Sequence, residues 1–505
     1  MFTPRKYAHD LKFNLLSRAR WKAQREGAVY QAIITRLTHY IDYEGGNDWN
    51  TGTRAAPWKH CKGMAGCAAG SVADSYVPKA RDRFNFKGGV TWPTTALPFN
   101  ITVSGSGPLL GVITYSSDNS WYKGPVWSCP IFDGEDTAVD GWSLVVINAS
   151  NITFEKIEIK NMRLPLIAEA SLYMKFSLKL YGSFGLPYNT GITINDCYVH
   201  DWISHAAENH KCGGIGIQYA GGVVNECEIR GHEAAVDQRV GVGFYMAGDS
   251  AVTELGNCHI HNMPNGIVVA QYLESVHDCE IHHINKAIDT PITHENGMIV
   301  GIRDNGTAEF YNNEVYDTAS GAPPVYIYPH KEESAVGVVA KAYNNIVYGM
   351  TDTTNGIIFD GRLTAHAYNN VLDECQLRLV KKDNSITFDG VYFKNNIFLN
   401  EGRINIDAGT VRHVEEYDYN LYDGSLPTII VWEGAPETLA QIQVRGHELN
   451  GLVDNPLLGA DYKSTIGTAP GVDSGVDMSA HFTIDHDNLV RPQGAAWDRG
   501  AYEYV

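Results

Sequence analysis

One six-residue pattern recurs ten times along this 505-residue chain and restricts the folds that the chain can adopt. Each copy has an apolar residue, two polar or small residues, in most cases a Cys or Asn, an outward position and a second apolar residue. The copies read FEKIEI, INDCYV, VNECEI, LGNCHI, VHDCEI, FYNNEV, AYNNIV, AYNNVL, FKNNIF and YDYNLY, and they begin at Phe154, Ile194, Val224, Leu255, Val276, Phe310, Ala342, Ala367, Phe393 and Tyr417.

A second short apolar run, often opened by Gly, follows nearly every copy, as in GIGIQY, GVGFYM and GIIFDG. Two short strands in a turn of about 25 residues, with variable insertions, are typical of a parallel β-solenoid. Leucine-rich repeats and β-propellers are disfavoured, because neither the LxxLxL spacing nor a four-stranded blade fits. We therefore predict an all-β chain that forms a single-stranded parallel β-helix of about ten coils.

The fourth position of the pattern changes from cysteine to asparagine along the chain. If the coils stack in register, this position forms a ladder inside the solenoid, where thiols pack as small hydrophobes and amides bond to the turns above and below. We expect four free core thiols and no redox role for them. The ladder residues are Cys197, Cys227, Cys258, Cys279, Asn313, Asn345, Asn370, Asn396 and Asn420.

The charge of the chain is unevenly distributed. The whole sequence has 39 Lys and Arg against 58 Asp and Glu, a net charge of −19, which disfavours nucleic acid as the main partner. Residues 1–40 alone carry a net charge of +6 and show roughly helical apolar spacing, so we predict a basic helical arm or cap there. No apolar run is long enough for a membrane span, and residues 1–15 lack the features of a secretory signal.

Four segments resemble a known superfamily. They are YIDYEGGNDWNTGTRAAPWKHC (40–61), FNFKGGVTW (84–92), VINASNITFEKIEIKN (146–161) and RPQGAAWDRGAYEY (491–504), the last with Arg499 where an apolar residue is usual. Together with the repeat, they resemble the right-handed parallel β-helix of the pectate-lyase-like superfamily over residues 40 to 505. The resemblance implies the fold but leaves the activity open, because this superfamily includes lyases, hydrolases, epimerases, phage tailspikes and adhesins.

This resemblance divides the chain into four predicted segments. Residues 1–40 form the short α-helical arm or cap, and residues 41–145 the opening segment with the first coils. Residues 146–425 form the central right-handed β-helix, and residues 426–505 a C-terminal coil or cap segment.

Long loops between the two strands of a coil are the expected place for function. The sequence predicts such loops at 200–213, 230–240 and 282–296, with a short turn at 261–265. The long loops would form the walls of a groove, and the short turn would leave its floor open. Ten of the 19 histidines fall between residues 200 and 294, which concentrates ionisable side chains in the same region. We therefore expect a groove over these coils.

Two reactions fit the loop residues. A glycosidase needs two carboxylates about 5 to 9.5 Å apart, for which Asp237 and Glu295 are the best pair. A β-eliminating lyase needs a base and a positive group that neutralises a uronate carboxylate. The candidate bases are Lys211, His210 and His294, and Arg239 is the candidate neutraliser.

The remaining candidates are expected to bind substrate. They are Glu208 and Glu233 in the loops, Asn265 before a Gly-led strand, and Tyr326, Tyr328 and His330 in the run VYIYPH, where tyrosines could stack on sugar rings.

Familiar pectin enzymes are disfavoured, because the polygalacturonase motifs NTD, DD, GHG and RIK are absent and no acidic Ca²⁺-binding cluster is found. We assign no metal ligands and no cofactor, with a divalent cation such as Ca²⁺ left open. Outward positions of the repeat alternate acids and histidines, which favours a solvated surface of charge pairs over a metal site. These positions are Glu228, His259, Glu280 and Glu314, with His200, Arg230, His261 and His282 beside them.

The resemblance to phage tailspikes completes the functional expectation. We expect a virion or extracellular protein, made in the cytoplasm without a recognisable signal peptide, that binds and cleaves a surface polysaccharide by lyase or hydrolase chemistry. It would be a homotrimer attached to a virion through residues 1–40. Two alternatives stay open: a receptor-binding or adhesin β-helix without activity, and a bacterial secreted polysaccharide lyase.

Overall fold

The computed structural model divides the chain into two units, Met1–Leu37 and Thr38–Val505. The residues described are 37–107, 111–137, 144–164, 175–182, 189–204, 212–232, 241–248, 254–270, 273–284, 296–318, 323–330, 336–350, 355–380, 387–425 and 427–505. Almost all of the predicted basic arm therefore lies outside the described residues. No helix among the described residues is long and apolar enough to span a membrane.

Three sheets of 13 strands each run along the described part of the second unit, and each coil adds one strand to each sheet. Sheet 1 holds the strands of the repeat: β1 (Thr38–Ile41), β2 (Arg83–Gly88), β5 (Ile113–Tyr122), β8 (Ile152–Glu155), β12 (Asn189–Asn195), β16 (Ala220–Asn225), β19 (Glu254–Gly256), β22 (Ser275–His277), β25 (Thr307–Tyr311), β28 (Val339–Tyr343), β31 (Thr364–Tyr368), β35 (Gly390–Lys394) and β39 (Glu415–Asp418).

Sheet 2 follows sheet 1 after a tight turn in each coil. Its strands are β3 (Thr91–Trp92), β6 (Ile131–Asp133), β9 (Glu158–Lys160), β13 (Tyr198–His200), β17 (Glu228–Arg230), β20 (His259–Met263), β23 (Glu280–Ile284), β26 (Glu314–Thr318), β29 (Ile346–Tyr348), β32 (Val371–Asp373), β36 (Ile397–Leu399), β40 (Leu421–Tyr422) and β43 (Leu452–Val453).

Sheet 3 closes the coil. Its strands are β4 (Phe99–Ile101), β7 (Leu144–Ile147), β11 (Lys175–Tyr181), β15 (Cys212–Gln218), β18 (Val242–Ala247), β21 (Asn265–Val269), β24 (Met298–Ile302), β27 (Val325–Pro329), β30 (Ile357–Asp360), β33 (Gln376–Val380), β37 (Arg403–Ile406), β41 (Ile430–Trp432) and β42 (Ala435–Glu437). The smaller elements are β10 (Arg163–Leu164) with β14 (Ile203–Ser204), β34 (Thr387–Phe388) with β38 (Val411–Arg412), α2 (Val72–Ser75), α3 (Leu439–Val444) and a 3-10 turn at Thr94–Ala96.

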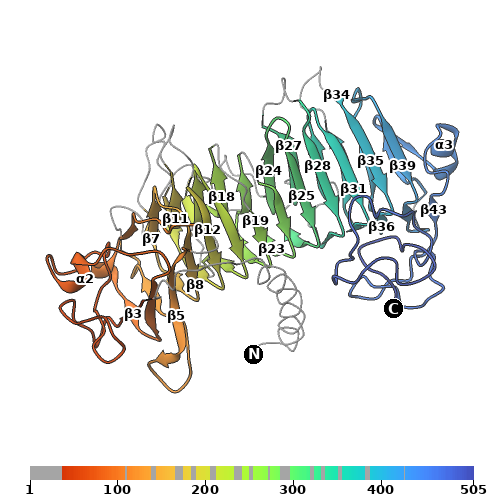
Figure 1. The fold of residues 1–505 in the computed structure, drawn as a ribbon. Helices are drawn as coiled ribbons and strands as arrows, with labels where there is room; N and C mark the ends of the chain where they lie inside the picture. Colours follow the sequence, from red (N-terminus) through yellow and green to blue (C-terminus); the bar gives the residue numbers. More distant parts are fainter. Residues whose placement is uncertain are drawn as a thin grey trace, which may run out of the picture. The chain divides into compact units, whose positions relative to one another are not determined.

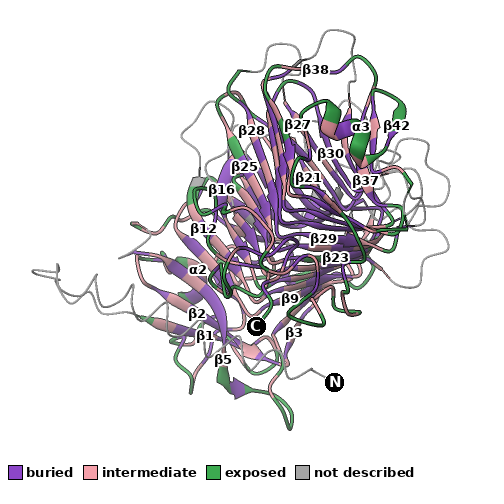
Figure 2. Ribbon diagram, turned by 90° about the vertical axis from the view of Figure 1, so that its right-hand side faces the viewer, coloured by how far each residue is buried: buried purple, intermediate pink, exposed green. Residues whose placement is uncertain are grey.

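The fold is a right-handed parallel β-helix, as predicted, and its coils stack one on another from β1 to β39 (Figure 1). Apart from β41 and β42, which are antiparallel, the described strands of these sheets pair in parallel. Buried residues follow the strands of the stack, and exposed residues gather in turns and around α3 (Figure 2).

The ten copies of the repeat correspond to the ten strands of sheet 1 from β8 to β39. Strand β1 and two coils, β2 to β4 and β5 to β7, precede them and do not follow the pattern, because aromatic rings fill their interior instead. Phe86, Trp92 and Phe132 pack there with ring centroids 5.3 to 5.5 Å apart, and all three are fully buried.

The predicted asparagine ladder is confirmed. Each amide of the ladder donates to a main-chain oxygen of the preceding coil, and the four amides before Asn420 also donate to the side-chain oxygen of the next asparagine. Asn370, for example, donates to the Ala342 carbonyl at 2.9 Å and to Asn396 Oδ1 at 3.0 Å, and it accepts from the main-chain N–H and the amide of Asn345. The ladder therefore joins successive coils through the interior, where each polar group has a partner.

The four ladder cysteines are buried free thiols, as predicted. The thiol of Cys279 points to the carbonyl of Leu255 in the preceding coil at 3.7 Å. The Asn313 amide donates to the carbonyl of Val276, which has the equivalent position one coil later. Burial raises the pKa of the Cys258 thiol well above its usual value, which keeps it protonated. The main-chain N–H of Cys279 donates to Asn313 Oδ1 at 3.1 Å and so joins the two kinds of ladder.

The residue before each ladder position makes the tight turn from sheet 1 to sheet 2. In all ten copies of the repeat it has a left-handed backbone, with φ between 52° and 59°. Asn and Asp tolerate this conformation best among non-glycine residues, which explains why they hold most of these positions. The turn residues are Lys156, Asp196, Glu226, Asn257, Asp278, Asn312, Asn344, Asn369, Asn395 and Tyr419.

The C-terminal segment contacts three of the later turns of this kind. Amides of Asn344, Asn369 and Asn395 donate to its main-chain oxygens, each at 2.8 Å. Arg499 is only 5% exposed, and its guanidinium donates to the carbonyl of Asn420 at 2.9 Å. The unusual arginine of the closing motif thus binds main-chain oxygens where an apolar residue could not.

Truncation of one ladder residue should destabilise the whole stack. Asn370→Ala removes an amide that makes four buried hydrogen bonds and leaves their partners unpaired, so we expect a loss of about 3 kcal/mol or more in unfolding free energy. Denaturant unfolding measures this loss, and Asn119→Ala at an exposed site is the control. Equal stability of the two variants would contradict the role of the ladder.

The last ladder amide meets a fully buried carboxyl group, and this should make stability depend on pH. Burial raises the pKa of Glu448 to about 7, although hydrogen bonds from Asn420 and Tyr422 pull the pKa the other way. Because the folded pKa lies above the unfolded one, this stabilisation is complete below about pH 4.5 and is lost as the pH rises through about 7.

The unfolding temperature of Glu448→Gln should therefore fall less than that of the unchanged protein between about pH 5 and pH 8. In unfolding free energy, the two proteins should differ by at most about 3 kcal/mol over this range. Asp498, whose burial raises its pKa to about 6, acts in the same direction in both proteins. Thermal unfolding followed by circular dichroism measures the two slopes, and identical slopes would contradict the assignment.

Candidate functional site

A column of glycines marks the corner at which each coil enters sheet 3. A Cβ atom on Gly243 would lie 2.5 Å from Met263 Sδ, and one on Gly297 would lie 2.7 Å from the carbonyl of Pro324. A Cβ on Gly214 would meet Ile229 Cγ2 at 3.0 Å. The Gly-led pattern of the sequence therefore reflects crowding between the corner and the core residues of sheet 2.

The three long loops predicted to form walls join sheet 2 to sheet 3 just before this corner. They lead into β15, β18 and β24, while a single residue separates β20 from β21, as the predicted short turn requires. The predicted loop residues lie outside the described residues: Glu208, His210, Lys211, Glu233, Asp237, Arg239, His294 and Glu295. Their arrangement stays a prediction.

The strands that follow these loops, β15, β18 and β24, all belong to sheet 3. The order β15, β18, β21 and β24 places the strands after Asp237 and after Glu295 two steps apart. At about 4.8 Å for each step, β18 and β24 are separated by about 10 Å.

Two buried amides stand in register at the corner between them. Asn265 begins β21, and Asn296 has the equivalent position before β24, since Ile267 pairs with Met298. The two side chains are 2% and 1% exposed. Among the described residues, neither side-chain oxygen has a hydrogen-bond partner, although the Asn296 amide donates to the carbonyl of Pro323 at 2.6 Å.

This register column lies at the edge of the outward face of sheet 3. Asn355 has the corresponding position before β30, and its side-chain oxygen accepts from the outward Arg378 at 3.3 Å. The two buried amide oxygens are thus acceptors that a ligand on this face could use.

Aromatic rings continue the same face along the coils. Tyr326 and Tyr328 on β27 are half-buried, alternate with core residues and have ring centroids 5.6 Å apart. The ring of Tyr328 lies over Gly301 of the preceding coil, where a Cβ would come within 3.2 Å of it. The Tyr326 hydroxyl donates to the carboxylate of Asp360, which is 1% exposed on β30.

Two further rings lie on earlier coils of this face. Tyr245 on β18 is 6% exposed and stacks with Phe176 at 5.7 Å between centroids. Burial raises the pKa of Tyr245 to about 12, and the phenol of Tyr328 adds to the shift. Phe176 lies over Gly216, so aromatic side chains take the room that glycines of neighbouring coils leave free.

Sequence reasoning found the tyrosines of β27 but not Asp360, Tyr245 or Phe176. The only signal of Tyr245 and Asp360 is an outward position in a Gly-led run, which many solvent-exposed residues share, and Phe176 lies in a run that no glycine opens. His330, another predicted site residue, follows β27 and is half-buried, and its main-chain N–H donates to the carbonyl of Ile302 at 2.7 Å.

The outward face of sheet 2 carries the predicted column of acids and histidines, and several charge pairs are present there. His200 contacts Asp201 at 2.6 Å and Glu158 at 3.3 Å, and His261 Nε2 lies 3.3 Å from Glu228 Oε1. The hydroxyl of Tyr316 donates to Glu280 at 2.6 Å, and that of Tyr348 donates to Glu314 at 2.7 Å.

Histidines of the solenoid differ sharply in basicity. Burial disfavours protonation of His277, but its bonds to Asp278 at 2.8 Å and Glu254 at 3.0 Å outweigh burial and raise its pKa to about 9. Burial and the neighbouring His259 and His261 lower the pKa of His282 to about 4. At neutral pH, His277 is therefore cationic and His282 neutral.

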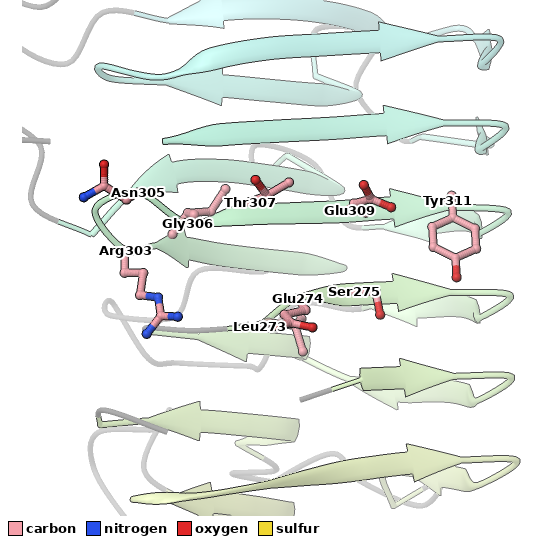
Figure 3. A pocket seen from close by; sticks show the side chains of 10 residues that line it. Leu273, Glu274, Ser275, Arg303, Asn305, Gly306, Thr307, Glu309 and Tyr311 are labelled. Atoms are coloured by element: carbon pink, nitrogen blue, oxygen red, sulfur yellow. The ribbon is translucent and has the colours of Figure 1, made fainter. Parts of the chain in front are cut away.

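A pocket of about 430 Å³ lies on the outward face of sheet 1, away from the predicted groove. Figure 3 shows Thr307, Glu309 and Tyr311 along β25, with Arg303 on the turn at one end of this strand. Glu309 also binds Lys341 at 2.7 Å. The pocket is lined by positively and negatively charged side chains, but by none of the residues predicted to be functional.

Comparison with solved structures finds similar chains. The chain is similar to the pectate lyase Pel9A, with 13% identity over 93% of this chain and 97% of that chain and a TM-score of 0.47. It is also similar to GH136 lacto-N-biosidase from Eubacterium ramulus (12% identity, 76% and 67% covered, TM-score 0.47) and to a rhamnogalacturonan lyase (12%, 75% and 84%, TM-score 0.38).

No protein-family model matches the sequence, and no curated protein matches it. The similar structures are lyases and a glycoside hydrolase, but identities this low carry no information about the chemistry of a site.

The paired His277 provides a test of these electrostatics. Since its folded pKa lies above the unfolded one, its stabilisation is complete below about pH 6.5 and is lost as the pH rises through about 9. His277→Gln should therefore lose more stability at about pH 6 than at about pH 9.5, as measured by denaturant unfolding. The same loss at both pH values would contradict the pairing with Asp278 and Glu254.

Proposed function

We propose that this protein binds a polysaccharide along the outward face of sheet 3 and cleaves it beside β18, β21 and β24. The observation that supports the proposal best is the pair of half-buried tyrosine rings on the outward face of sheet 3, with two buried amide oxygens at the corner of the two preceding coils that lack partners among the described residues. These are the two kinds of group that a sugar uses.

The chemistry of a sugar fits this face. A pyranose presents an apolar C–H face that stacks on an aromatic ring, and hydroxyl groups that donate hydrogen bonds at its edge. Tyr326 and Tyr328 offer the rings, and Asn265 and Asn296 offer acceptors on the two preceding coils. The β-helix repeats these positions at the coil spacing of about 4.8 Å, which suits a chain of sugars better than a single small ligand.

Cleavage is assigned to the loops that lead into the same strands. The separation of about 10 Å between β18 and β24 is close to the carboxyl spacing of about 6.5 to 9.5 Å that an inverting hydrolase needs, which favours Asp237 with Glu295. For a lyase, Lys211 would act as base and Arg239 would neutralise a uronate, since the strands that follow them are adjacent.

We further propose that the protein works outside the producing cell, as a trimeric phage tailspike attached through the basic residues 1–40. The net charge of +6 in this arm, against a strongly acidic remainder, supports a separate attachment role. Secretion by a bacterium as a polysaccharide lyase is the rival assignment. Light scattering of the full chain and of a form without residues 1–40 would test the trimer and its dependence on the arm.

Binding and cleavage can be measured separately on the full chain. The probes are polygalacturonate, xylan and capsular polysaccharides, with product release followed by reducing ends and by the ultraviolet absorbance of unsaturated ends. Loss of two stacking rings in Tyr326→Ala/Tyr328→Ala should weaken binding about tenfold or more. Tyr392→Ala, a half-buried ring on sheet 1, is the matched control and should bind normally.

Asp237→Asn and Glu295→Gln should bind the same polysaccharide and release no reducing ends if the reaction is hydrolysis. Lys211→Ala should instead abolish unsaturated products if the reaction is elimination. Unchanged binding by the double tyrosine variant would refute the site on sheet 3. Binding without any product from the unchanged protein would identify a receptor-binding or adhesin β-helix and refute the enzyme.

A further inference from the structure

Three histidines converge on the outward face of sheet 2, at a place separate from the proposed sugar site. His259 and His261 alternate with core residues on β20, and His282 stands on β23 in register with His261. One ring nitrogen of each lies within 4.8 Å of the corresponding atoms of the other two. Stacking of neighbouring coils therefore brings the three imidazoles together from two strands.

The contact between His259 and His282 is unusually close. Their Nε2 atoms are 2.6 Å apart, shorter than the separation of about 2.9 Å in an ordinary N–H···N or N–H···O hydrogen bond. The ring centroids of His259 and His261 are 4.1 Å apart, and those of His261 and His282 are 5.0 Å apart. One ring nitrogen of each of the three histidines thus lies at a common place.

Other histidines of this chain show a different arrangement. His200 and His277 each have a carboxylate near both ring nitrogens, at 2.6 to 3.3 Å. In the three-histidine cluster, by contrast, His259 and His282 contact each other through Nε2, and the carboxylate of Glu280 lies 4.0 Å from His282 Nε2. Charge pairing explains the first arrangement but not the close contact of His259 with His282.

We propose that His259, His261 and His282 bind one divalent transition-metal ion, with Zn²⁺ as the best fit. Zn²⁺ takes imidazole nitrogens at about 2.0 to 2.1 Å in tetrahedral geometry, which places two such nitrogens about 3.3 Å apart. Opening the 2.6 Å contact by less than about 1 Å reaches this spacing.

Carboxylates around the cluster complete a coordination sphere. Glu228 Oε1 lies 3.3 Å from His261 Nε2, and Glu280 Oε1 lies 4.0 Å from His282 Nε2. Both glutamates are more than 40% exposed, whereas His261 and His282 are buried to about nine-tenths, so a metal could reach the imidazoles from the solvent side. Three imidazoles and a carboxylate favour Zn²⁺, Co²⁺ or Ni²⁺ over the oxygen-preferring Ca²⁺ and Mg²⁺.

A second layer of contacts orients His282. Its Nδ1 contacts Nδ1 of His283, and His283 Nε2 lies 3.3 Å from the carboxylate of Asp317 on the next coil. Such outer contacts fix the ring orientation of metal-binding histidines. The bound ion would link β20 to β23 by coordinate bonds, in addition to the main-chain bonds of the sheet.

The inference does not depend on the proposed polysaccharide function, and the test needs no substrate. The full chain is stripped with a chelator, and binding of Zn²⁺ is measured by titration calorimetry, with Co²⁺ absorption bands as a report on geometry. We expect one site per chain, tetrahedral Co²⁺ bands, and no competition from Ca²⁺ or Mg²⁺ at equal concentration. Zn²⁺ should also raise the unfolding temperature.

The double variant His259→Gln/His282→Gln should bind Zn²⁺ about 100-fold more weakly or not at all. The matched controls His277→Gln and His366→Gln remove outward histidines of sheet 1 and should leave binding unchanged. His259→Gln alone, at a half-buried position, gives the same test if the double variant does not fold. Absence of Zn²⁺, Co²⁺ and Ni²⁺ binding by the folded unchanged protein, or undiminished binding by the His259 variants, would overturn the site.

Discussion

The ladder of asparagine and cysteine side chains is the interaction on which this solenoid depends. It fixes the register between coils from the inside, because each amide bonds to a main-chain oxygen of one neighbour and to the side chain of the other. The residue before the ladder position has a left-handed backbone in all ten copies of the repeat, with φ between 52° and 59°. A coil that slipped by one residue would bury the wrong side chains and leave the amides unpaired.

The constant register between coils also aligns side chains on the outward faces of the sheets. Any residue type that recurs at one outward position becomes a column at the coil spacing of about 4.8 Å, and each sheet carries different columns. Sheet 2 brings His259, His261 and His282 together, whereas sheet 3 brings together aromatic rings and the buried amides Asn265 and Asn296. One structural device therefore supports a candidate metal site and a candidate sugar site on separate faces.

Sequence reasoning predicted the parts of the molecule that repeat. The ten pattern copies, the buried thiols and the amide ladder follow from local spacing alone. It could not predict contacts between distant segments, such as the fully buried ion pair of Arg491 with Glu503, or the burial of Asp360, since these depend on which neighbours cover a residue. The first coils could not be predicted from the repeat, because aromatic packing replaces the pattern there. The predicted loop residues lie outside the described structure.

The central claim is that a sugar chain lies along sheet 3, and amide hydrogen exchange with and without a bound oligosaccharide tests it most directly. The account predicts slower exchange in peptides that cover β21, β24 and β27, where the buried amides and tyrosines stand. Peptides that cover β22 and β25 of sheet 1 should exchange as before. Protection confined to β22 and β25, around the pocket of Glu309 and Tyr311, would contradict the account and move the binding site to sheet 1.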